Sequence, residues 1–156
     1  ELLTDELLTL PGPVVEDPNP LNQSLPFRNL IRGRSLGLPS GQAVARVLSD
    51  TEYPVEMTDL KLETAQGWKA LKPAIRAELR EATPLFYYIL RESNVVHQGQ
   101  HLGPVGSAIL MEVFGGILSL CTESFLSDRS WSPSEEVAGA DHRLTLADLL
   151  RYVERY

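Results

Sequence analysis

The sequence predicts a mainly α-helical fold, and two observations support this. Apolar residues recur at helical spacing in several segments, and most of these segments begin at a proline, serine or threonine. No segment shows the alternation of apolar and polar residues that is typical of a half-buried strand. With 156 residues, of which 43% are hydrophobic, the chain has the size and composition of one soluble domain with a core.

The predicted organisation is a single segment with three parts. Residues 1–22 are expected to form an extended lead-in, because its second half contains prolines, which break a helix. Residues 24–126 are expected to form the helical core. Residues 127–156 are predicted to form a loop and a terminal helix.

Two short helices are expected at the start of the core. Ser24 can cap a helix that has Pro26 in its first turn, where the missing N–H of proline costs least. This helix should end within residues 33–37, because glycine there permits a positive φ. Ser40 begins the second helix, in which three apolar residues lie at helical spacing, namely Val44, Val47 and Leu48.

The later helices are predicted from their caps and apolar stripes. Residues 73–80 read as a charged surface helix, and Thr83 should cap a helix over residues 85–95. Residues 105–120 are predicted to form a buried core helix that includes Met111, Phe114, Ile117 and Leu118. Thr145 and Asp148 have the spacing of a capping box, followed by apolar residues on one face of the last helix, Leu146, Leu149, Leu150 and Val153.

Charge and length argue against several classes of protein. The net charge of −7 argues against a nucleic-acid partner, because phosphate binding needs a basic surface. The apolar segment 105–120 is too short for a membrane span and carries Glu112 in its middle. The single cysteine, Cys121, excludes an internal disulfide and is expected to be a packed thiol.

The histidines predict no metal site. His97 and His101 are four residues apart, a spacing that would place two ligands on one face of a helix. Gly99 lies between them and interrupts a helix, and no third ligand stands beside them. His142 lies in a polar stretch and is expected at the surface.

An arginine cluster in residues 25–41 is the strongest candidate site. Arg28, Arg32 and Arg34 fall within seven residues of an acidic chain. On a helix, Asn29 and Arg32 would share one face, so an amide and a permanent cation would lie side by side. Two interpretations follow: the arginines pair with carboxylates of the chain, or Arg32 binds an external anion with Asn29 as an orienting amide.

Two motifs stand out in the sequence: LPFRNLIRGR at residues 25–34, followed by GLP at 37–39, and LGPVG at 102–106. They resemble motifs of the haem peroxidase superfamily that includes the animal peroxidases, and above all its bacterial branch. The stretches LPG at 10–12 and PNPL at 18–21 resemble what precedes this helix in bacterial members. The resemblance extends over residues 10–126.

The resemblance implies a helical fold around a haem and gives two residues a role. Asn29 would accept a hydrogen bond from the ring nitrogen of the histidine that ligates the iron, and Arg32 would contact a haem propionate. Arg28 and Arg34 are expected to form structural ion pairs. Ser35 and Leu36 stand where Asp and His commonly follow in the animal enzymes, which leaves the role of Arg34 open.

No catalytic residue is expected in this chain. In the family the distal and the iron-ligating histidines come from segments upstream of the motif, whereas His97, His101 and His142 all follow it. The chain is therefore expected to be the C-terminal portion of a peroxidase, inactive by itself, with the rest of the peroxidase chain as its partner.

The whole enzyme would reduce hydrogen peroxide and oxidise an organic or halide donor. Two alternatives stay open at this point. One is a non-catalytic helical interaction module that binds an acidic partner, and the other is a haem-dependent fatty-acid dioxygenase of the same superfamily.

Overall fold

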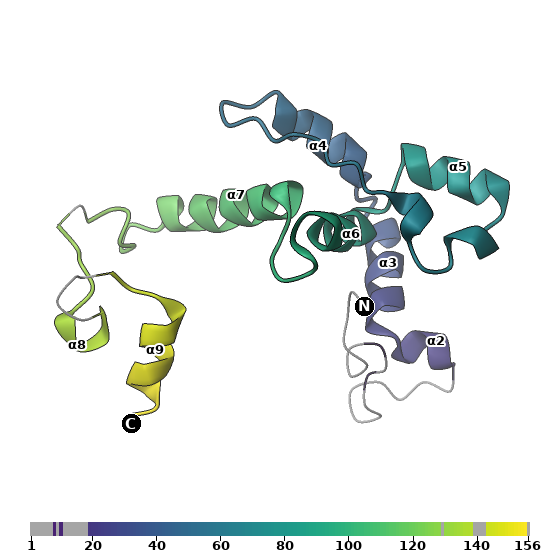
Figure 1. The fold of residues 1–156 in the computed structure, drawn as a ribbon. Coiled ribbons are helices and arrows are strands. Elements are labelled where there is room, and N and C mark those ends of the chain that lie inside the picture. Colours follow the sequence, from purple (N-terminus) through teal and green to yellow (C-terminus); the bar gives the residue numbers. More distant parts are fainter. Residues whose placement is uncertain (1–7, 9, 11–18, 129, 139–142, 156) are drawn as a thin grey trace. The chain divides into compact units, whose positions relative to one another are not determined.

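The protein is mainly helical, as predicted (Figure 1). The computed structural model describes residues 8, 10, 19–128, 130–138 and 143–155. Among these residues there is no strand, and the only bridge of the β type joins Ser40 and Pro84. Contacts divide the chain into two compact units, Glu1–Glu112 and Val113–Tyr156.

The first unit holds the segment in which the arginine cluster lies. Helix α6 (Leu85–His97) packs against both α3 (Leu25–Ser35) and α4 (Gly41–Ser49) (Figure 1). The remaining elements are α2 (Pro20–Gln23), two 3₁₀ turns (Leu62–Thr64 and Trp68–Ala70), α5 (Pro73–Glu81) and the beginning of α7 (Pro104–Leu120).

The predicted starts of α3 and α4 are confirmed. Ser24 Oγ accepts a hydrogen bond from the Phe27 N–H at 3.4 Å, and Ser40 Oγ accepts one from the Ala43 N–H at 3.2 Å. Each hydroxyl satisfies a backbone donor that the first turn of a helix leaves without a partner. Local capping chemistry therefore fixes where both helices begin.

The predicted extended lead-in is wrong at its end, because α2 is helical over Pro20–Gln23. Asn19 caps this turn: its Oδ1 accepts from the Leu21 N–H at 3.0 Å. Pro20 occupies the first helical position, where it stabilises a helix instead of breaking one. Residues 11–18 of the lead-in lie outside the described residues.

The prediction for Thr83 is also wrong: it does not cap α6. Its hydroxyl donates to the Leu79 carbonyl at 2.6 Å. The Gln42 amide makes a reciprocal pair with Thr83, since Gln42 Nε2 donates to Thr83 Oγ1 at 2.8 Å and the Thr83 N–H donates to Gln42 Oε1 at 2.9 Å. Thr83 therefore ties α4 to the junction of α5 and α6.

The core of the first unit forms around Tyr88 of α6, whose side chain is fully buried. Ala45 of α4 and Val105 of α7 are fully buried too, and Trp68 is nearly so. The other members of this core are Leu60 and Leu62. Val47, which was predicted on the apolar face of α4, is instead 69% exposed.

Replacing Gly41 by alanine is expected to destabilise the first unit by about 1–3 kcal/mol through overpacking. A Cβ at this buried position would overlap the Tyr88 ring, which has no room to move because it is fully buried. Thermal or urea unfolding measures the loss. Gly33→Ala is the control, because a Cβ there meets only Leu38 Cδ1, at an ordinary 3.6 Å. Equal stability of the two variants would contradict the close packing at Gly41.

Two buried charged residues of α6 hold the neighbouring segments. Arg91 donates to the carbonyls of Leu60 (2.8 Å) and Lys61 (2.7 Å), and also to Thr64 Oγ1 and Asn94 Oδ1. Lys61 has a positive φ of 45°, so the guanidinium stabilises a turn that a non-glycine residue rarely adopts.

Glu92, the next residue, is fully buried and anchors the start of α7. Its Oε2 accepts hydrogen bonds from the N–H groups of Val105 at 3.0 Å and Gly106 at 3.3 Å. Its Oε1 accepts from Thr58 Oγ1 at 3.2 Å. A carboxylate at a helix N-terminus satisfies free backbone donors and is favoured by the helix dipole.

The prediction that α7 is a buried core helix is wrong beyond its first turn. Only Val105 and Gly106 are buried in this helix, whereas Met111, Phe114 and Ile117 are 70%, 57% and 58% exposed. A helix that is apolar all round needs neighbours on every side to be buried, and the described residues supply them only at its start. No described helix is long and apolar enough to cross a membrane.

The second unit contains α8 (Glu135–Ala138) and α9 (Leu146–Val153). The predicted capping box is confirmed, with Asp148 N donating to Thr145 Oγ1 at 3.3 Å and Thr145 N donating to Asp148 Oδ2 at 3.0 Å. The apolar residues of α9 are exposed, with Leu146 at 72%. Cys121, expected to be a packed thiol, is exposed as well.

Candidate functional site

The candidate site is built on α3, whose end is fixed by Gly37. Gly37 has a φ of 63°, and its N–H donates to the Arg34 carbonyl at 3.1 Å. The Leu38 N–H donates to the Gly33 carbonyl at 2.9 Å, which completes a Schellman motif. The predicted glycine exit is therefore confirmed, and the chain turns back beside α3.

Asn29 and Arg32 lie on one face of α3, as their spacing predicted. Arg32 Nη2 donates a hydrogen bond to Asn29 Oδ1 at 2.6 Å. The bond fixes the amide with its oxygen towards the guanidinium. An amide oxygen has two lone pairs, so Asn29 Oδ1 can accept a second hydrogen bond, and its NH₂ group keeps two donors.

The arginines of α3 form no ion pair within the described part of the chain. Arg28 Nη1 donates to the Asn22 carbonyl at 3.4 Å, and Arg32 binds the Asn29 amide. Arg34 has neither a hydrogen bond nor an ion pair through its side chain with any described residue. The expectation that Arg28 and Arg34 form structural ion pairs is therefore wrong for this part of the molecule. An exposed guanidinium has little to gain from a surface ion pair.

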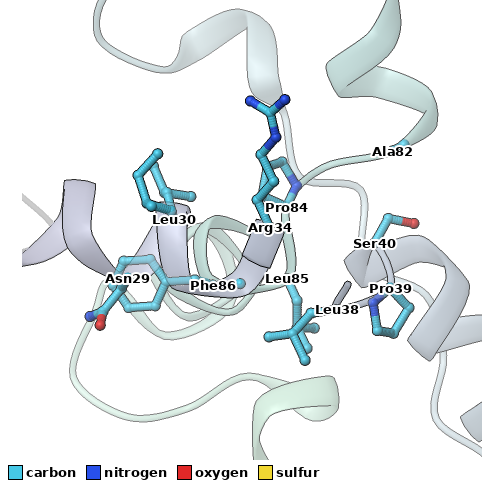
Figure 2. Close-up of a pocket in the computed structure, with 12 residues that line it drawn as sticks. Asn29, Leu30, Arg34, Leu38, Pro39, Ser40, Ala82, Pro84, Leu85 and Phe86 are labelled. Carbon is cyan, nitrogen blue, oxygen red and sulfur yellow. The ribbon is translucent and has the colours of Figure 1, made fainter. Parts of the chain in front are cut away.

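A pocket of about 450 Å³ lies beside α3 (Figure 2). Its walls come from α3, from the turn after it and from the start of α6, and they are mostly apolar. Asn29 and Arg34 line the pocket, whereas Arg32 does not. The other lining residues are Leu30, Ile31, Gly33, Leu38, Pro39, Ser40, Ala82, Pro84, Leu85 and Phe86.

Sequence reasoning found Asn29 but missed Arg34 and the apolar walls. Leu30, Gly33 and Arg34 follow the spacing i, i+3, i+4, which places them on one helix face and could have indicated this wall of the pocket. The opposite wall could not be predicted from spacing, because Pro84 and Phe86 are distant in the sequence. The volume lies in the range typical of small-molecule sites, which are apolar with a few polar groups.

A second pocket, of about 300 Å³, lies at the core beside Tyr88. The Tyr88 hydroxyl is buried and has no hydrogen-bond partner among the described residues. Burial raises the pKa of Tyr88, and the nearby Glu92 charge raises it further. The hydroxyl therefore stays protonated at neutral pH and can donate to a small polar guest, water included.

The rings of His97 and His101 lie close together, although the chain between them is not helical. His97 ends α6, and after Gln98 and Gly99, both with positive φ, His101 returns until the two ring centroids are 4.3 Å apart. The described residues contain no group of three or more potential metal ligands. His142 lies outside the described residues.

Comparisons with protein-family models, with curated proteins and with solved structures found no match for this chain. The site offers an exposed amide–guanidinium pair, an apolar pocket and the Arg34 guanidinium, which has no partner among the described residues.

Proposed function

We propose that this chain forms part of the cofactor-pocket wall of a haem peroxidase, which reduces hydrogen peroxide while oxidising an organic or halide donor. The observation that carries the proposal is the 2.6 Å hydrogen bond between Arg32 and Asn29, beside an apolar pocket. The family resemblance of residues 25–39 assigns these two residues to the haem, and their arrangement is compatible with that role.

The residues fit the cofactor chemically. Asn29 Oδ1 would accept a hydrogen bond from the ring N–H of an iron-ligating histidine, which fixes the imidazole tautomer and orientation. Arg32 would hold the Asn29 amide in place and donate its remaining N–H groups to a propionate. When bound, haem supplies the redox chemistry with peroxide, and its potential depends on hydrogen bonds of this kind. The apolar walls of the pocket would keep water away from a bound haem.

The exposed apolar surface supports the proposal that the chain is one part of a larger fold. Large apolar side chains of α3 and α7 face solvent, among them Ile31 at 47% and Met111 at 70%. Exposed apolar surface often marks a contact with another part of a protein or with a partner. The rest of the peroxidase would cover them and supply the distal and proximal histidines.

The test compares this chain with the natural protein that contains it. With haemin, the natural protein is expected to give a histidine-ligated Soret band and peroxide-dependent oxidation of a donor. The 156-residue chain alone should give neither. A sharp histidine-ligated Soret band with strong donor oxidation from the chain alone would contradict the assignment of the histidines to another part of the protein.

Asn29→Ala in the natural protein is expected to lower peroxidase activity by about 10–100-fold, because a partner of a metal-ligating histidine is lost. The iron reduction potential should shift as well. Arg32→Ala should weaken haem affinity by about tenfold, through loss of one charge-assisted contact. Arg46→Ala, an exposed arginine on α4, is the matched control and should change nothing. An unchanged potential in Asn29→Ala would contradict the proposed role.

A helical interaction module is the second candidate, and it is favoured because the α3 arginines form no ion pair with any described residue. An acidic partner would bind with an affinity that falls steeply with salt, because the exposed charges are screened. The dioxygenase alternative keeps the haem and differs in substrate, so oxygen uptake with a fatty acid separates it from a peroxidase.

A further inference from the structure

We propose that Arg34 is the carboxylate-binding residue of the α3 pocket, and that the pocket takes a ligand with an apolar body and one carboxylate. Two sources share this chemistry: a haem propionate in addition to the one at Arg32, or a free alkyl carboxylic acid. The propionate source rests on the proposed function, whereas the alkyl source does not.

The Arg34 guanidinium is the cation that would bind the carboxylate. Arg34 lies in the last turn of α3, is exposed and has no side-chain partner among the described residues. In Figure 2 its guanidinium points away from Leu38 and Leu85, so the cation stands at one edge of the pocket and the apolar side chains at another. A ligand that spans the pocket would therefore meet apolar walls along its body and a cation at one end.

The charge of the lining favours an anionic ligand. Among the other polar groups in the lining, Ser40 Oγ caps α4 and Asn29 Oδ1 accepts from Arg32, whereas the Asn29 NH₂ group keeps donors that can also bind an anion. No carboxylate of the described residues lines the pocket. An incoming anion therefore meets no like charge there, and a planar guanidinium can bind both oxygens of a carboxylate.

The size and polarity of the pocket favour a ligand with an apolar body. A volume of about 450 Å³ admits a short alkyl chain or one edge of a macrocycle. Leu30, Leu38 and Phe86 provide apolar contact, which favours a hydrocarbon over a sugar or a nucleotide. Arg34 is the one cation among the described residues of the lining, so a single carboxylate fits better than a polyphosphate.

The test titrates the 156-residue chain with octanoate and with octan-1-ol, which has the same alkyl chain without the charge. Amide chemical shifts of α3 report binding. Octanoate should bind about tenfold more tightly than the alcohol, because a hydrogen bond to a charged group adds that much. Arg34→Gln should remove the preference for octanoate, and Arg46→Gln should keep it. Leu38→Asp, which adds a carboxylate to the lining, should abolish octanoate binding.

The outcomes of this titration test the role of Arg34 separately from the proposed peroxidase function. An equal preference for octanoate in Arg34→Gln and in the unchanged chain, or no shift at the α3 amides, overturns the proposal. Displacement of octanoate by haemin, but not by haemin dimethyl ester, identifies the propionate source. Displacement by neither identifies the alkyl source. Either of the two negative results would leave the Soret test of the natural protein unaffected. Failure of the Arg34 proposal can therefore be told apart from failure of the peroxidase proposal.

Discussion

Arg91→Ala is expected to lower the free energy of unfolding of the first unit by about 3 kcal/mol, because buried acceptors lose hydrogen bonds from a charged donor. The Leu60 carbonyl loses its side-chain donor, and Thr64 and Asn94 each lose the hydrogen bond from the guanidinium. The Lys61 carbonyl loses one donor and keeps the N–H and the hydroxyl of Thr64. The turn at Lys61 with its positive φ would lose its support as well.

Urea unfolding of the chain measures this loss. Arg91→Lys should recover only a small part of it, because one ammonium cannot reach the donor directions of a planar guanidinium. Arg46→Ala, an exposed arginine of α4, is the matched control and should stay within about 0.5 kcal/mol of the unchanged chain. A loss below about 1 kcal/mol in Arg91→Ala would show that water replaces the guanidinium at no great cost.

Glu92→Ala is expected to cost about 3 kcal/mol, because buried N–H groups of Val105 and Gly106 lose their acceptor. The start of α7 would then be held by packing, with Val105 in the core and Ile109 against it. Hydrogen exchange at these two amides should accelerate more than exchange in α4. Unchanged protection of both amides in the variant would contradict the anchoring role.

Glu92→Gln separates the hydrogen bonds of this side chain from its charge. Burial raises the pKa of Glu92 above 4.5, and this outweighs the hydrogen bonds from Gly106, Thr58 and Val105, which lower it. The folded state therefore holds the proton more tightly than the unfolded state. The corresponding stabilisation is present below the unfolded pKa and is lost as pH rises through the folded pKa.

The measurement is the difference in unfolding free energy between the unchanged chain and Glu92→Gln as a function of pH. Gln stays neutral, so the difference should move in favour of the variant as pH rises from about 4 to about 8. A difference that is constant over this range would contradict the raised pKa. Glu81→Gln on α5, at an exposed carboxylate, is the matched control.

Helix starts and ends could be predicted from the sequence wherever their chemistry is local. The caps at Ser24, Ser40 and Thr145 and the glycine exit of α3 each depend on residues within a few positions. The contacts of Thr83 could not be predicted in this way, because its hydroxyl accepts from Gln42 and its N–H donates to Gln42, which is far away in the sequence. The prediction that α7 is buried was wrong for the same reason, because burial depends on what packs against a helix.

The candidate site also has one part that local spacing predicts and another part that it does not. The Asn29–Arg32 pair follows from a spacing of three on a helix. The pocket and the place of Arg34 in it depend on the start of α6, whose position beside α3 no local pattern encodes. The role of haem at this site stays a prediction.

Arg91 and Glu92 are adjacent in the chain and buried, and all their described hydrogen bonds go to uncharged groups. Their contribution is charge–dipole attraction in a region that dissolved ions do not enter. The exposed pair of Arg80 and Glu63, 2.8 Å apart, is instead open to screening by salt. A change in ionic strength can therefore weaken the Arg80–Glu63 pair at the surface of this unit. The hydrogen bonds of Arg91 and Glu92 to residues 58–64 and to the start of α7 should be affected much less.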